Sequence, residues 1–325
     1  MKTLMMGTAM LAAAALGLPA ADTVAQSFPA KPVRIVVGFP PGGGADFVAR
    51  LVAQKLGDSL KQQIVVDNRA GANGIIASEL VAKSPPDGYT LLLGVSATHA
   101  INPTVYANLP YDAVKDYVPV SEVALTPLIL VVTPSLPVSN VRELVTLARA
   151  KPNQLNFASA GTGNVTHLAG ELFKSMTGIQ ITHVPYKGSS PAIVDLMAGQ
   201  VMLYFDTMPS SLPHVRAGKL KGLAVTSAKR SGSAPEIPTV AESGVPGFET
   251  TSWFGVLAPA GTPAAIGEML HREIVKALST SDSLDRMKQQ GLDSVLNSPS
   301  EFATVIRTDI EKWAKVIKDA NIKVQ

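Results

Sequence analysis

From about residue 30 onward, short apolar runs alternate with amphipathic helical patterns, and this alternation constrains the fold more than any other feature. The helical runs place apolar residues at i, i+3 and i+4, as Asn164–Thr177 does. Strands that alternate with helices predict βαβ units, mostly parallel sheets and therefore an α/β protein. The predicted strands are Val33–Phe39, Ile64–Asp67, Thr90–Val95, Pro119–Val123, Leu128–Thr133, Asn156–Ala160, Ile181–Tyr186, Met202–Asp206 and Leu220–Thr226.

The C-terminal part of the chain is predicted to be helical. Thr262 and Pro263 supply a cap and a first-turn proline for a helix that runs to about Leu278. A last helix, from about Pro299 to Ala320, is followed by no strand. We therefore expect it to pack back on an earlier part of the chain and to complete the N-terminal lobe of a two-lobed protein. Its apolar stripe comprises Phe302, Val305, Ile306, Ile310, Trp313, Val316 and Ile317.

The length of 325 residues is sufficient for two globular lobes, and the returning C-terminus predicts that the first lobe is discontinuous. We expect the chain to cross between the lobes near residues 123–127 and 247–252. Thr126-Pro127 and Gly244–Gly247 have the composition of hinges there. The predicted lobe 1 is residues 26–124 plus 251–325, and lobe 2 is residues 125–250.

The first residues have the pattern of a secretory signal peptide. Lys2 supplies the positive charge, Leu4 to Leu18 the apolar region, and Thr23-Val24-Ala25 a small-residue cleavage site. The alternative, a membrane anchor, is disfavoured because the apolar run is short for a span of about 20 residues. We therefore predict that residues 1–25 are a signal peptide cleaved near Ala25.

Composition excludes several classes of protein. The 28 basic and 25 acidic residues form no basic stripe, and aromatic residues make up 5%, so nucleic-acid binding is not expected. The absence of cysteine excludes disulfides, thiolate metal sites, a cysteine nucleophile and a lipidated cysteine anchor. The product is expected to be a freely soluble, exported protein, which in a Gram-negative bacterium means the periplasm. No metal or cofactor is predicted.

A glycine-rich turn, Gly38–Asp46, joins the first predicted strand to a helix over Ala45–Leu60. The turn lacks both the Gly-x-Gly-x-x-Gly spacing and the Gly-Lys-Ser/Thr of phosphate-binding loops. The helix start still offers unpaired N–H groups and a positive dipole end to an anion. Asp46 lies in the first helical turn, where a carboxylate complements the dipole. The plain alternative for the whole stretch is a tight strand-to-helix turn.

A second loop, Ser159–His167, repeats this arrangement between a strand and a helix. Ser159, Thr162, Thr166 and Asn164 add side-chain donors. If each lobe presents such a helix start to a shared cleft, neutral donors could hold a carboxylate from both sides.

Other candidates lie at the carboxyl ends of predicted strands, which face the cleft in open α/β sheets. Ser96 and Thr98 follow one strand, whereas Tyr186 and Asp206 end two others. A lone aspartate at such an end is more often a helix cap than a ligand contact. Phe205 and Trp253 could line an aromatic pocket with Tyr186 or belong to the core.

Enzymatic patterns are scarce. There is no Gly-x-Ser-x-Gly elbow, and none of the five histidines forms His-x-x-x-His. His167 adjoins an apolar stripe and is interpreted as a packing or polar-network residue. An exported hydrolase that uses a pair such as Ser96 and His99 remains as an alternative, and so does a sensory module that presents its ligand to a membrane receptor.

Several segments together resemble a known family. They include RIVVGFPPGGGADFVARLVAQKL, NRAGANGIIASELVAKSPPDGYTLLLG, NFASAGTGNVTHLAGELFKSMTGIQITHVPYKGSSPAIVDLMAGQV and PEIPTVAESGVPGFETTSWFGVLAPAGTP. The sequence resembles the exported solute-binding proteins of tripartite tricarboxylate transporters, the Bordetella uptake gene family. The resemblance implies a two-lobed type II periplasmic-binding-protein fold with a ligand cleft between the lobes. It also implies a non-enzymatic, monomeric protein that delivers a small carboxylate to a permease with a large and a small membrane subunit.

In that family, backbone amides, hydroxyls and ordered water hold the carboxylate instead of an arginine clamp. The resemblance maps the first anion loop to Phe39–Phe47, the second to Ser159–His167, and the strand-end aspartate to Asp206. The ligand itself stays open among aliphatic di- and tricarboxylates, amino acids and aromatic acids. The predicted ligand-binding residues are Phe39, Pro41, Gly42, Gly43, Ala45, Asp46, Phe47, Ser96, Thr98, Ser159, Ala160, Thr162, Gly163, Asn164, Thr166, His167, Tyr186 and Asp206.

Overall fold

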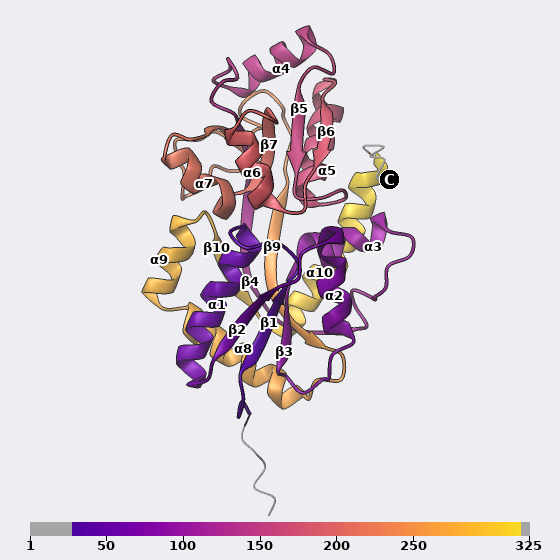
Figure 1. Ribbon diagram of the computed structural model, residues 1–325, viewed down its shortest axis with the longest axis vertical. Helices are drawn as coiled ribbons and strands as arrows, with labels where there is room; N and C mark the ends of the chain where they lie inside the picture. The colour runs from indigo at the N-terminus through magenta and orange to yellow at the C-terminus, as the bar shows by residue number, and fades with distance from the viewer. Residues whose placement is uncertain (1–27, 320–325) are drawn as a thin grey trace, which may run out of the picture.

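One long strand, β4 (Tyr117–Val132), runs through both halves of the molecule in the computed structural model, which describes residues 28–319. From Tyr117 to Pro127 it pairs antiparallel with β9 (Thr251–Pro259). From Leu128 onward its partners are β7 (Leu203–Thr207) and β8 (Lys221–Val225), also antiparallel. Figure 1 shows β4 and β9 in the region between the lower lobe and the upper lobe.

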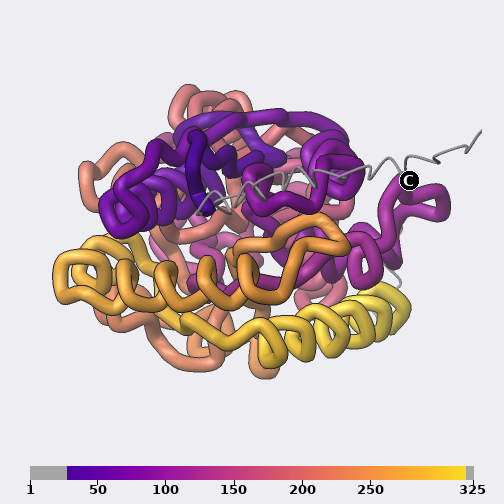
Figure 2. Tube along the Cα trace, turned by 90° about the horizontal axis from the view of Figure 1, so that it is seen from below, coloured from indigo at the N-terminus to yellow at the C-terminus, as the bar shows by residue number. Residues whose placement is uncertain are grey.

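The lower lobe is built on the parallel strands β2 (Ile64–Asn68), β1 (Val33–Val37) and β3 (Thr90–Val95), and β9 and β4 continue the sheet beyond β3. Its first crossover helix, α1, follows β1 directly and carries a buried apolar face. Figure 2 shows the N-terminal segments and the C-terminal helices on opposite sides of this end of the molecule. The remaining elements of the lobe are α1 (Gly44–Leu60), η1 (Ala72–Gly74), α2 (Ile75–Ala82), η2 (Ala97–Ile101), α3 (Asn102–Val105), α8 (Ala264–Leu278), α9 (Ser281–Gln289), β10 (Asp293–Asn297) and α10 (Pro299–Asp319).

The upper lobe has β5 (Asn156–Ser159) at its centre, parallel to β7 on one side and to β6 (Thr182–Pro185) on the other. Each of these strands runs into a helix, as the alternating pattern predicted. The helices are α4 (Val141–Ala150), α5 (Val165–Thr177), α6 (Ser189–Met197) and α7 (Met208–Arg216). The carboxyl ends of β5 and β7 therefore turn into helix starts at the boundary with the lower lobe (Figure 1).

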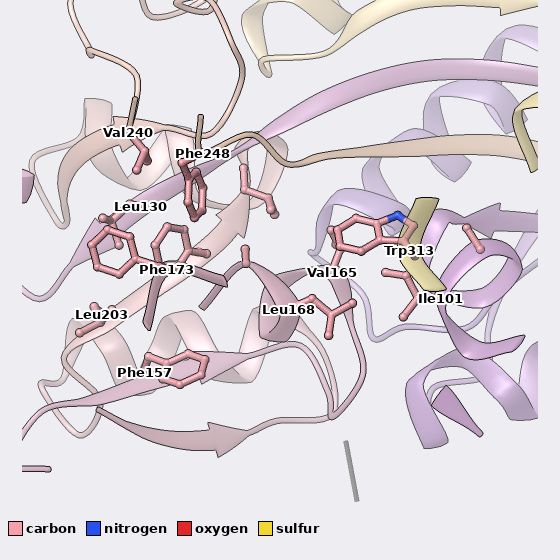
Figure 3. Packing of buried hydrophobic residues seen from close by; sticks show 14 of the residues in the cluster. Ile101, Leu130, Phe157, Val165, Leu168, Phe173, Leu203, Val240, Phe248 and Trp313 are labelled. Atoms are coloured by element: carbon pink, nitrogen blue, oxygen red, sulfur yellow. The ribbon is translucent and has the colours of Figure 1, made fainter. Parts of the chain in front are cut away.

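The last helix packs back on earlier elements, as its apolar stripe predicted. Phe302, Ile306 and Trp313 are buried, and the other stripe residues are partly buried against the same cluster. This cluster extends into the upper lobe: Figure 3 shows Trp313 of α10 near Val165 and Leu168 of α5. A continuous apolar core therefore links α10 to the start of α5.

Several predicted elements were wrong in detail. The two strands predicted at Pro119–Val123 and Leu128–Thr133 are one strand, because β4 stays extended through Pro127 and changes partners there. The sheet is mixed instead of mostly parallel, since the strands between the lobes pair antiparallel. The strands β9 and β10 were missed; both owe their pairing to the distant strand β4.

The predicted signal peptide, residues 1–25, lies outside the described residues. Within the described part of the chain, residues 28–319, none of the helices combines the length and the apolar character that crossing a membrane requires.

Candidate functional site

Four helices begin around one cavity between the lobes. The start of α1 contributes Gly43–Ala45, and the start of α5 contributes Asn164–Thr166. Ser189 opens α6, and Thr207 is the residue before α7. Apolar side chains supply most of the remaining wall. The complete lining is Phe39, Pro40, Gly43, Gly44, Ala45, Val95, Ala97, Ala160, Asn164, Val165, Thr166, Ser189, Thr207, Ser252 and Phe254.

Three backbone N–H groups of the lining at the starts of α1 and α5 are unused. Within residues 28–319, the amides of Gly43, Ala45 and Val165 donate to no protein acceptor. They belong to the first turns of α1 and α5, where N–H groups have no partner inside the helix. Buried N–H groups are normally paired, so a site that leaves three free is suited to an anion.

The polar side chains around the cavity are already engaged within the protein. Asn164 Oδ1 accepts from the amide and the hydroxyl of Thr166 at 3.1 Å each. The Ser189 hydroxyl donates to Asp206 Oδ1 at 2.7 Å, and Ser252 shares a hydrogen bond with Ser96 at 2.8 Å. Among the described residues no Lys, Arg, Asp, Glu or His lines this cavity. Its affinity for an anion must therefore come mainly from backbone dipoles.

Asp46 holds the first loop in place without lining the cavity. Its carboxylate accepts from the Gly42 amide at 3.0 Å, from Arg50 Nε at 2.9 Å and from Asn68 Nδ2 at 2.9 Å. Burial would raise the pKa of Asp46, but the hydrogen bonds from Arg50, Gly42 and Asn68 outweigh it and hold that pKa below its usual value. The side chain does not line the cavity, and it fixes the loop that does.

The second loop is braced by neutral groups. The Thr166 hydroxyl accepts from the Ala160 amide at 2.9 Å, and His167 Nδ1 accepts from the Gly163 amide at 3.2 Å. The His167 ring stacks on His183 at 3.9 Å, and His183 Nε2 shares a 2.6 Å hydrogen bond with Ser159. Burial lowers the pKa of His167 to about 3 and that of His183 to about 4, so both rings are neutral at pH 7. His167 thus belongs to a polar network and lines neither cavity, although it was also among the predicted ligand-binding residues.

Asp206 lies behind the cavity wall. Its two oxygens accept from Ser189 and from Ser211, each at 2.7 Å, and the side chain is fully buried. Burial raises its pKa to about 6, although these hydrogen bonds oppose the rise. Asp206 therefore positions Ser189, which does line the cavity.

The cleft is closed in this structure. The Gly44 amide donates to Ser210 at 2.8 Å, and the Ser190 hydroxyl donates to the Pro41 carbonyl at 2.7 Å. On the other side of the cavity, Asn164 Nδ2 donates to Asn73 Oδ1 at 2.8 Å. These hydrogen bonds join the lower lobe to the upper lobe on both sides of the helix starts.

A second cavity lies in the same cleft. It is lined by the glycine-rich turn Gly71–Gly74, by Gly161 and Thr162 of the second loop, and by Pro185–Lys187. Tyr106 also lines it, and its hydroxyl donates to the Thr162 carbonyl at 3.1 Å. The predicted residue Tyr186 lies here, with its hydroxyl donating to Asp195 at 2.7 Å.

The predicted residues Ser96 and Thr98 make hydrogen bonds to other groups of the protein. Ser96 is bonded to Ser252, whereas Thr98 Oγ1 is bonded to Val95 and to His99 Nδ1 at 2.9 Å. His99 is completely buried, and burial lowers its pKa to about 3. Ser96 and His99 thus bond to other groups and not to each other, so the structure contains no Ser–His pair at this position.

The structure brings together part of the predicted set. The first cavity is lined by Phe39, Gly43, Ala45, Ala160, Asn164 and Thr166, and the second by Phe39, Ala160, Thr162 and Tyr186. The other predicted residues line neither cavity; Phe205 and Trp253 are in the core. The lining residues outside the predicted residue set are Pro40, Gly44, Val95, Ala97, Val165, Ser189, Thr207, Ser252 and Phe254 in the first cavity and Gly38, Gly71, Ala72, Asn73, Gly74, Tyr106, Gly161, Pro185 and Lys187 in the second. Of these, Pro40, Gly44, Gly161 and Val165 lie inside the two predicted loops.

Some of these residues had a sequence signal. Ser189 and Thr207 each lie just after a predicted strand, where carboxyl strand ends face the cleft, so the rule that selected Tyr186 and Asp206 would have found them. Phe254 and Ser252 had none, because they reach the cavity through the unpredicted strand β9.

Comparison with known proteins decides the family. Residues 48–322 match the model of the tripartite tricarboxylate transporter family receptor. The chain belongs to this family. The receptor resembles Protein BugT of Bordetella pertussis, with 41% identity over 307 residues that cover 94% of each chain.

Two solved structures extend the comparison. R. palustris Rpa4515 with adipate matches at a TM-score of 0.89 and 42% identity over 90% of this chain and 98% of that one. The periplasmic binding protein BugD matches at 0.88 and 33% identity over 92% and 100%. These matches confirm the predicted family and the two-lobed periplasmic-binding-protein fold, whose members are solute-binding proteins.

Proposed function

We propose that this receptor captures a small carboxylate in the cleft between its lobes and performs no catalysis on it. Lobe 1 is residues 26–124 plus 251–325, and lobe 2 is residues 125–250. The ligand carboxylate lies in the first cavity, at the starts of α1 and α5. The two loops there, Phe39–Phe47 and Ser159–His167, supply the donors or brace them.

The free amides of Gly43, Ala45 and Val165 carry this proposal. A charged acceptor pairs with each of them at about 1.5–3 kcal/mol per hydrogen bond, which supports micromolar binding after the costs of ordering and desolvation. The apolar walls from Val95 and Phe254 suit a hydrocarbon body beside the carboxylate. The similarity to a protein solved with adipate supports the same ligand class.

The proposal includes export and delivery. The first 25 residues direct the chain to the periplasm and are cleaved near Ala25, and the monomeric protein then passes its ligand to the large and small permease subunits of a tripartite tricarboxylate transporter. The family match supports this role.

Calorimetric titration tests the proposal. The exported protein, freed of bound ligand, is titrated with acetate, succinate, malate, adipate, citrate, glutamate and benzoate. Saturable micromolar binding of at least one acid, with a rise in Tm, is expected. Absence of binding for all of them would contradict the proposed function. Turnover of any acid in the same samples would instead indicate an enzyme.

A further inference from the structure

The two cavities of the cleft share only two lining residues, Phe39 from the lower lobe and Ala160 from the upper lobe. Ala160 has a single methyl group, so the phenyl ring of Phe39 is the bulky part of the shared wall. The first cavity contains the free helix-start amides. The second extends to the exposed side chain of Lys187 and is therefore continuous with the surface.

The backbone of Phe39 is fixed on both sides. Its carbonyl accepts from Asn68 Nδ2 at 3.0 Å, and Asn68 also donates to Asp46. The preceding Gly38 packs on Gly74 so closely that a Cβ at position 38 would lie 2.7 Å from the Gly74 Cα. Only glycine fits that contact, which sets the direction from which Phe39 enters the cleft.

The ring of Phe39 is supported by the turn before α2. A Cβ at Gly74 would lie 3.5 Å from both Cε2 and Cζ of the ring, so the ring tip rests against this turn. Gly74 has a φ of 83°, a left-handed conformation that disfavours other residues. The turn therefore gives the ring a firm backing.

We propose that Phe39 sets the maximum length of the ligand. The inference rests on the proposed function, because it takes the ligand carboxylate to lie at the starts of α1 and α5. A dicarboxylate that fits the first cavity ends at the Phe39 ring. Removing the ring joins the two cavities, so a longer chain can extend beside Thr162 and place its second carboxylate near Lys187, the sole charged residue that the described chain contributes to this lining.

Titration of straight-chain α,ω-dicarboxylates from four to ten carbons tests this inference by calorimetry on the wild type, Phe39→Ala and Phe39→Leu. The wild type should show an optimal length beyond which affinity falls. In Phe39→Ala the optimum should move by at least about two carbons, and affinity for the longer acids relative to the shorter should rise about tenfold, the effect of burying two methylenes. Phe39→Leu should lie between the two.

Phe28→Ala is the matched control, because Phe28 packs against the core of the lower lobe and lines neither cavity. It should keep the wild-type optimum. The ratio of affinities within one variant is independent of the fraction of protein that is folded, and Phe39→Leu carries the test if Phe39→Ala does not fold. An unchanged optimum in the folded variants overturns the inference alone. Failure of the wild type to bind any of these acids overturns the proposed function as well.

Discussion

The two loops that meet at the cavity look alike in sequence but are held in different ways. The first loop is fixed by an ionised group, since Asp46 receives hydrogen bonds from Gly42, Arg50 and Asn68. The second is fixed by neutral groups, namely Thr166, Asn164 and the stacked pair His167–His183. Both present free backbone amides to the same cavity.

This difference predicts that the two loops depend on pH in different ways. Asp46 stays ionised down to acid pH because its pKa is lowered, so it keeps the hydrogen bonds that fix the first loop. The contacts that fix the second loop require His167 and His183 to be neutral, and lowering the pH favours their protonated forms. Mutations and pH changes should therefore affect the two loops separately.

The largest expected effect comes from Gly44 at the start of α1. In Gly44→Ala the new Cβ would lie 2.8 Å from Thr207 Oγ1 of the upper lobe, so closure would be strained. Overpacking costs about 1–3 kcal/mol, which corresponds to a loss of carboxylate affinity of about fivefold to a hundred-and-fiftyfold by calorimetry.

The control for this variant is Gly267→Ala, in the middle of α8. A Cβ there would meet no atom within 4 Å, so binding should stay unchanged and stability should rise by about 0.5–1 kcal/mol. Equal affinities for the two variants would show that closure does not bring Gly44 against Thr207.

Asp46→Asn should destabilise the first loop. The variant loses the charge that Arg50 and the Gly42 amide face, and a hydrogen bond to a charged group contributes about 1.5–3 kcal/mol. We expect a drop of about 1–3 kcal/mol in the free energy of unfolding by urea and a weaker affinity for the carboxylate. Asp285→Asn removes an exposed carboxylate of α9 and should change neither quantity. A stability equal to the wild type would contradict the bracing role.

Lowering the pH should loosen the second loop before the first. An unfolded histidine has a pKa of about 6.5, whereas burial lowers the pKa of His183 to about 4. The stability that depends on neutral His183 is present above pH 6.5 and decreases as the pH falls toward 4. Hydrogen exchange at pH 5 should show reduced protection at residues 159–167 and unchanged protection at residues 39–47.

His183→Gln isolates this effect. Burial raises the pKa of Asp206 to about 6, so its protonation makes a contribution of opposite sign over the same range. Asp206 contributes equally to both proteins, so it cancels in the difference between their free energies of unfolding. That difference should become smaller as the pH falls from 7 to 5. A difference that is independent of pH between 7 and 5 would rule out the histidine brace.

Arg50→Gln should have the smallest effect. Its side chain is 56% exposed and pairs with Asp46 on the outer side of the loop. Partly exposed ion pairs contribute about 0–1 kcal/mol. Urea unfolding should therefore detect a loss well below that of Asp46→Asn, and an equal loss would mean that Arg50 and not the backbone amide dominates the brace.

The sequence predicted the parts of the site that depend on local order. A strand, a glycine-rich turn and a helix start are contiguous in the chain, so both loops were found. Ser96 was predicted at a strand end, but its hydroxyl is taken by Ser252, which reaches it across the pairing of β3 with β9. That pairing joins distant segments, and local patterns do not encode it. The same holds for Phe254, which lines the cavity from β9.

In the proposed function backbone amides hold the carboxylate, and amide NMR during a titration with adipate measures this directly. The protons of Gly43, Ala45 and Val165 should shift downfield together as adipate saturates the protein, while Gly267 stays unchanged. Saturable binding of adipate with these three amides unshifted, and with the shifts confined to Lys187 and its neighbours, would contradict the account.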